Sequence, residues 1–70
     1  MDAKEHKIKH VMFYVGLHPG HLLLAEMDDG RYCLLRDTEA APLECFPRDQ
    51  LRAAIDRYNE LKAELLPPQR

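Results

Sequence analysis

The chain contains no serine and no tryptophan, and its single threonine is Thr38. Hydroxyl nucleophiles of the kind that many hydrolases activate are therefore almost absent. The three glycines, Gly16, Gly20 and Gly30, are too far apart in the sequence to form a phosphate-binding loop. We interpret Cys33 as an inert buried thiol and the paired carboxylates Asp28 and Asp29 as turn residues, and we predict that the protein is not an enzyme and needs no cofactor.

Cysteine is also scarce, since Cys33 and Cys45 are the only two and eleven residues separate them. They have neither the C-x-x-C spacing nor the cysteine density of a secreted disulfide scaffold, so we expect two reduced, mostly structural thiols. No apolar run approaches the length of about 18 residues that a membrane helix requires, and residues 11–17 make a poor secretory signal. We therefore predict a cytoplasmic location and no membrane contact.

Charge of one sign is not concentrated over the chain, because the formal net charge is only −2 and acidic and basic residues alternate. Basic residues gather only near the N-terminus, at Lys4, His6, Lys7, Lys9 and His10. We interpret residues 1–9 as a charged flexible arm. A nucleic-acid-associated dimer that doubles this arm is the alternative function that the charge pattern leaves open, although we do not expect nucleic acid to be the partner.

The chain has 70 residues, of which 46% are hydrophobic. This composition predicts one globular domain over residues 10–66, followed by a short tail over residues 67–70. A chain of this length buries only about 60% of the surface that its unfolded form exposes. Domains this small often gain stability from a disulfide, a metal ion or oligomerisation.

Hydrophobic residues first recur with the two-residue period of a β-strand, at Val11, Phe13, Val15 and Leu17. Pro19 and Gly20 then predict a type II turn, and Asp29 and Gly30 predict a hairpin. Between and after these turns, residues 22–27 and 32–36 read as strands, and residues 43–46 as a possible short fourth edge strand.

The C-terminal part of the chain has the period of a helix. Pro47 suits a first helical turn, and Pro67 and Pro68 end the element. One apolar stripe is formed by Leu51, Ala54, Ile55, Tyr58, Leu61 and Leu65. The predicted fold class is α+β, a three-stranded antiparallel β-meander with a possible short fourth edge strand and one C-terminal amphipathic helix packed on one face.

Two-residue loops without bulges would pair Leu17 with Leu22 and Met27 with Tyr32. The face toward the helix then carries Val11, Phe13, Val15, Leu17, Leu22, Leu24, Cys33 and Leu35. The opposite face, called the second face below, carries Met12, Tyr14, Leu23, Met27, Tyr32 and Leu34, with His18 and His21 at one end.

This second face is more apolar than the water-exposed side of an antiparallel sheet normally is. We predict that it forms the interface of a homodimer, binds a larger protein, or does both, and that Leu34→Glu breaks this association without unfolding the chain. The protein would then be a small regulatory or adaptor protein, or a phage-type inhibitor, that acts sterically. The alternative is that residues 37–46 or the tail cover the face.

His18 and His21 lie opposite each other in the predicted hairpin, close enough for two imidazoles to reach one zinc ion. Two ligands are too few for a zinc site. We therefore predict no bound metal and interpret the two histidines as flanking residues of a turn, with a metal-binding protein as the third alternative.

Overall fold

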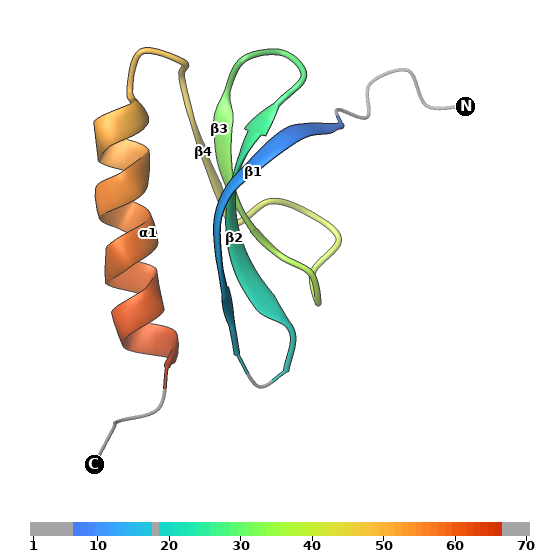
Figure 1. Cartoon of the computed structure of the whole chain (residues 1–70), viewed down its shortest axis with the longest axis vertical. Coiled ribbons are helices and arrows are strands. Elements are labelled where there is room, and N and C mark those ends of the chain that lie inside the picture. The colour runs from blue at the N-terminus through green and yellow to red at the C-terminus, as the bar shows by residue number, and fades with distance from the viewer. Residues whose placement is uncertain (1–6, 18, 67–70) are drawn as a thin grey trace.

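The computed structural model describes residues 7–17 and 19–66. It shows one antiparallel sheet, with strands in the order β1-β2-β3-β4, and one helix packed on one side (Figure 1). The elements are β1 (Ile8–Gly16), β2 (His21–Met27), β3 (Tyr32–Arg36), β4 (Glu44–Phe46) and α1 (Leu51–Leu65). The predicted α+β class and the short fourth strand are confirmed, and β1 begins inside the segment that we had assigned to the arm.

The loop between β2 and β3 has three residues instead of the predicted two. The backbone N–H of Met27 donates to the carbonyl of Arg31 at 2.8 Å, which leaves Asp28, Asp29 and Gly30 in the loop. Gly30 has a φ of +94°, as expected for the last residue of such a loop. One extra loop residue moves β3 by one position and turns each of its side chains to the other face.

The predicted pairing of β2 with β3 is therefore wrong. Leu24 pairs with Leu34, and Ala25 pairs with Cys33. Leu34 lies on the same side as Leu24, toward α1, and Cys33 lies on the second face.

The pairing of β1 with β2 is also displaced from the prediction, because Gly16 pairs with His21 and the backbone N–H of Leu17 donates to the carbonyl of Gly20 at 2.7 Å. This shift is by an even number of residues, so Phe13 and Val15 still lie on the side of α1. Two register shifts then interrupt β1, between Ile8 and His10 and between Val11 and Phe13. The second of these turns Val11 away from the helix, which a register without bulges could not anticipate.

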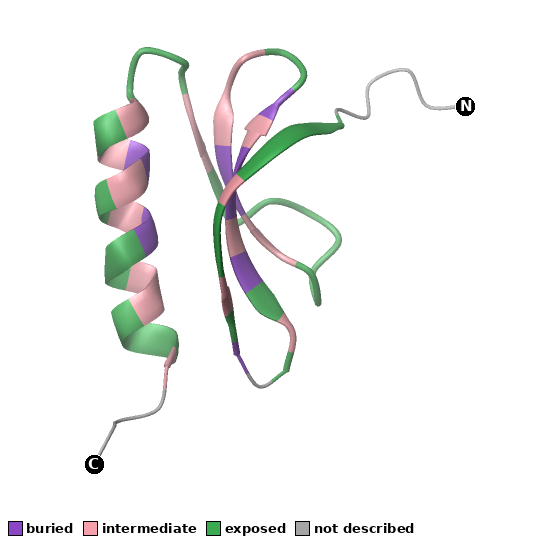
Figure 2. Ribbon diagram, in the orientation of Figure 1, coloured by how far each residue is buried: buried purple, intermediate pink, exposed green. Residues whose placement is uncertain are grey.

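The main core lies between α1 and the central strands, where Leu22, Leu24 and Leu34 are fully buried. Ala54 and Tyr58 pack on them from the helix, in the stripe that the helical period predicts. Figure 2 shows buried residues on the inner side of α1 and along β2 and β3, whereas most of β1 is exposed.

A second, smaller buried cluster lies on the second face, formed by Ala25, Met27 and Cys33. The loop over residues 37–43 passes on this side of the sheet, away from α1 (Figure 1). Cys33 and Cys45 are opposed on β3 and β4 and form a disulfide. The expectation of two reduced thiols is therefore wrong, because the register brings the two cysteines together across adjacent strands.

The helix begins later than Pro47 suggested. The backbone N–H of Gln50 donates to the carbonyl of Pro47 at 2.9 Å, so residues 47–50 form a turn ahead of α1. At the other end Leu66 is extended, which is the usual conformation of a residue that precedes proline. Arg57 fixes α1 against β4, since its Nε lies 3.1 Å from the Glu44 carboxylate.

Candidate protein-interaction surface

The residues that were predicted to form one interface do not all lie on the same face of the sheet. Leu34 is fully buried in the core beneath α1, and Tyr32 packs against that core. Their assignment to the second face is wrong for the reason given above, the additional residue in the β2–β3 loop. Leu34 is therefore a core residue that no partner can reach.

The other predicted interface residues are spread over different surroundings. Met27 is buried on the second face, and Leu23 lies half-buried opposite Tyr14. Met12 is half-buried at the bulge of β1, between Val11 and Phe13. Tyr14 is the most exposed large hydrophobic residue in the described part of the chain, at 69%. His18 lies outside the described residues.

Among residues 7–17 and 19–66, four of the six exposed large hydrophobic residues belong to β1, namely Ile8, Val11, Phe13 and Tyr14. The residue pattern predicts Val11 and Phe13 in the core and Ile8 in the arm. A strand inside a sheet pairs on both sides, whereas β1 is an edge strand that pairs only with β2 among the described strands. Its position at the edge explains the exposure, and the two-residue period alone could not distinguish an edge strand from a central one.

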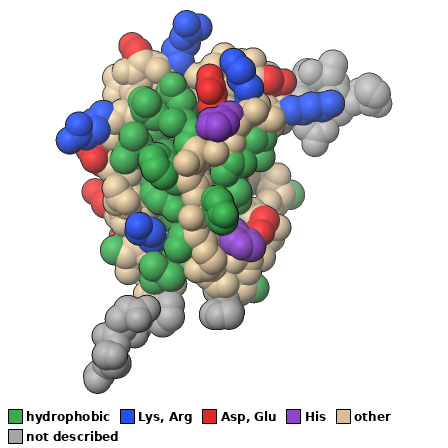
Figure 3. Space-filling model, in the orientation of Figure 1, with side chains coloured by type: hydrophobic (Ala, Val, Ile, Leu, Met, Phe, Trp, Pro, Cys, Tyr) green, Lys and Arg blue, Asp and Glu red, His purple; other side chains and the backbone are tan. Residues whose placement is uncertain are grey.

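A shallow groove of about 270 Å³ lies where α1 passes alongside β1. Its lining is formed by Phe13, Tyr14, Ile55, Tyr58, Asn59 and Lys62. The rings of Phe13 and Tyr58 lie 5.7 Å apart, and the Lys62 ammonium lies 5.7 Å from the centre of the Tyr58 ring. Figure 3 shows hydrophobic side chains gathered over this junction of helix and strand. Burial raises the pKa of the Tyr58 phenol above its ordinary value.

The two edges of the sheet differ in how they are protected. Natural edge strands are kept from pairing by lysines, bulges, proline or shortness. At one edge, β4 has only three residues and Pro47 follows it. At the other, the first half of β1 carries Lys9 and both bulges. The rest, residues 13–16, has no charge in its sequence and pairs with β2 without a register shift. We refer to residues 13–16 as the uncharged segment of β1.

His21 is bound by Asp37 and takes part in closing the turn. Its backbone N–H donates to Oδ1 of Asp37 at 2.8 Å, and its ring Nδ1 lies 2.9 Å from Oδ2. Gly20 has a φ of +77°, and a Cβ there would collide with the Asp37 carboxylate. The structure thus gives His21 a structural partner, and among the described residues no group of three or more His, Cys, Asp or Glu side chains could hold a metal ion.

This contact predicts a pH dependence of stability. The hydrogen bond from the His21 ring, followed by that from its backbone N–H, holds the pKa of Asp37 below its ordinary value. A carboxylate with a lowered pKa in the folded state stabilises at neutral pH, and that contribution is lost as the pH falls below about 4. We expect Asp37→Asn to unfold at lower urea concentration than the unmodified chain at pH 7, and the difference to shrink at about pH 3. An equal difference at both pH values would contradict this role.

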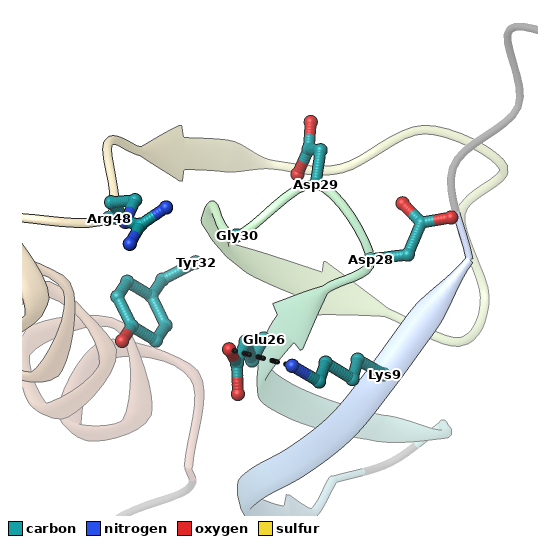
Figure 4. A pocket seen from close by; sticks show the side chains of 7 residues that line it. All are labelled: Lys9, Glu26, Asp28, Asp29, Gly30, Tyr32 and Arg48. Carbon is teal, nitrogen blue, oxygen red and sulfur yellow. Dashed lines mark ion pairs between the residues drawn. The ribbon is translucent and has the colours of Figure 1, made fainter.

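A polar pocket of about 360 Å³ lies beside the β2–β3 loop (Figure 4). Lys9, Glu26 and Asp29 make contacts within the fold. Lys9 points toward Glu26, with Nζ 3.8 Å from the carboxylate, and Asp29 accepts hydrogen bonds from the backbone N–H and Nε of Arg31. Asp29 therefore serves the turn, as the Asp-Gly sequence indicated.

Comparison with known proteins returns no match: no family model, no curated protein and no solved structure is significantly similar to the chain. Within residues 7–17 and 19–66, no helix is long and apolar enough to cross a membrane. The surface properties of the fold are therefore the basis for a functional proposal.

Proposed function

We propose that the protein is a small non-enzymatic interaction module that binds another polypeptide through the free edge of β1. The observation that carries this proposal is the uncharged segment of β1, an unprotected strand edge with Phe13 and Tyr14 exposed at 43% and 69%. Exposed edges of this kind accept an additional strand, whose main-chain hydrogen bonds supply affinity. The groove beside α1 would receive side chains of the added strand.

The mode of action that fits such a module is steric, as a regulatory adaptor or as an inhibitor of the phage type. A partner segment that adds as a strand to β1 uses its backbone N–H and C=O groups to bond to β1. Those groups are then blocked from other contacts, or the module bridges the partner to another protein. Aromatic and methionine residues, which are enriched in protein interfaces, occur in β1 as Met12, Phe13 and Tyr14. This replaces the second face, along which the loop over residues 37–43 passes (Figure 1), with β1 as the proposed contact element.

Photo-crosslinking tests this proposal. We would replace Tyr14 with p-benzoylphenylalanine, and in a control chain replace Leu43, which is also exposed but lies in the loop before β4. Irradiation in cells that make the protein should attach a polypeptide at position 14 and much less at position 43. No polypeptide adduct at position 14, or equal adducts at both positions, would contradict the proposal.

Two further predictions from the sequence have different support. Lys9 has an acidic neighbour, Glu26, 3.8 Å away, and this offset of one basic residue favours a protein partner over nucleic acid. Phosphate-driven binding would weaken steeply with salt, and a salt titration separates the two.

The cytoplasmic location was inferred in part from free thiols, and the Cys33–Cys45 disulfide favours an oxidising compartment instead.

A further inference from the structure

We propose that the partner of β1 is a second copy of this chain, paired antiparallel through the uncharged segment. This inference rests on the proposed function and names its partner. A two-fold axis perpendicular to the sheet would join two four-stranded sheets, β1 against β1, into one continuous sheet. The same axis keeps the faces matched, so both α1 helices lie on the same side, with the two copies of β1 between them.

The uncharged segment is complementary to itself on both faces. Phe13 and Val15 lie on the side of α1, where Phe13 contacts Tyr58 and Val15 packs on the core. Tyr14 lies opposite Leu23 on the other side. Two-fold pairing brings Phe13 and Val15 of both copies together between the helices and brings the two Tyr14 side chains together on the second face. Apolar cross-strand pairs of this kind stabilise antiparallel sheets.

The positive charge of Lys9 determines which part of β1 can pair with β1 of the second copy. Pairing centred on Lys9 would place like charges directly opposite each other, which is destabilising. Pairing centred within the uncharged segment keeps the two Lys9 residues at least eight positions apart, or roughly 26 Å along the strands. That separation exceeds the Debye length of about 8 Å at physiological ionic strength, so the repulsion is screened. The end of β1 that carries Lys9 is thereby kept out of the interface.

The available apolar area predicts a weak, reversible dimer. Taking about 200 Å² for a whole aromatic side chain, the exposed fractions of Phe13 and Tyr14 amount to roughly 220 Å² in each copy. Stable interfaces of standard size bury about 800 Å² per partner. A single strand edge with its groove belongs below that size, in the range of transient contacts, so dimerisation should depend visibly on concentration.

Sedimentation equilibrium between about 10 µM and 1 mM tests this pairing. The weight-average mass should rise from the 8.2 kDa of one chain toward twice that value. Tyr14→Lys places a charge on the exposed segment as natural protected edges do, and should hold the mass at that of one chain over the same range. The matched control Leu43→Lys, at the loop before the far edge strand, should dimerise like the unmodified chain.

Each result decides the inference. A mass of 8.2 kDa at every concentration overturns it, and so does a dimer that Tyr14→Lys leaves intact while its circular dichroism stays that of the folded chain. If the chain is monomeric but position 14 crosslinks to a different polypeptide, the second copy is excluded and the interaction module stands. If position 14 yields no adduct of either kind, both proposals fail.

Discussion

Leu34→Glu is expected to leave the chain unfolded at neutral pH and room temperature. Leu34 is a fully buried residue of β3 that pairs with Leu24 and packs in the main core beneath α1. Burying an unpaired carboxylate costs several kcal/mol, and a domain of this size rarely has more than about 3–5 kcal/mol of stability in total. Far-ultraviolet circular dichroism should show a disordered chain.

The control for this prediction is Leu43→Glu, since Leu43 is also a leucine near β4 but is 44% exposed. It should remain folded and change the free energy of unfolding by less than about 0.5 kcal/mol. A folded Leu34→Glu chain that had merely lost self-association would instead support the original register, in which Leu34 lies on the second face. That outcome would contradict the three-residue β2–β3 loop described here.

Removal of the disulfide is expected to produce the other large loss of stability. The bond between Cys33 and Cys45 joins β3 to β4 across 12 residues of sequence. Crosslinks that close loops of about this length contribute roughly 3 kcal/mol, by restricting the unfolded chain. For so small a domain, this corresponds to a fall in Tm of roughly 10–25 °C.

Thermal unfolding with and without dithiothreitol measures this effect. The unmodified chain should melt at the lower temperature when reduced, whereas a Cys33→Ala/Cys45→Ala chain should melt at a low temperature that the reductant does not change. Equal melting of the oxidised and reduced chain would show that β4 does not depend on the bond.

The element types follow from local patterns, and their pairing does not. The two-residue period of β1 and the helical period of α1 are properties of neighbouring residues, so both elements were predicted from the sequence. Loop length is different, because Asp-Asp-Gly is compatible with a two-residue and a three-residue hairpin loop. The choice between them reversed the faces of Cys33 and Leu34, and with them the predicted interface.

The disulfide and the exposed edge could not be predicted for a related reason. Cys33 and Cys45 become neighbours only when β4 is placed beside β3 in one particular register. Likewise, Phe13 has the pattern of a core residue, and its exposure follows from the position of β1 at the edge of the sheet and from the placement of α1 over β2, β3 and β4. Both are properties of the tertiary arrangement. Tyr14 was assigned to the interface from the sequence and also belongs to the uncharged segment of β1 that the structure favours.

Amide hydrogen exchange along β1, measured in dilute and in concentrated solution, tests the central claim most directly. Pairing through the uncharged segment predicts that outward-facing amides of residues 13–16 exchange more slowly as the concentration rises, while the amides of residues 8–10 do not change. Exchange in residues 13–16 that is the same at both concentrations, or slowing that is confined to the second face around Met27, would contradict the account.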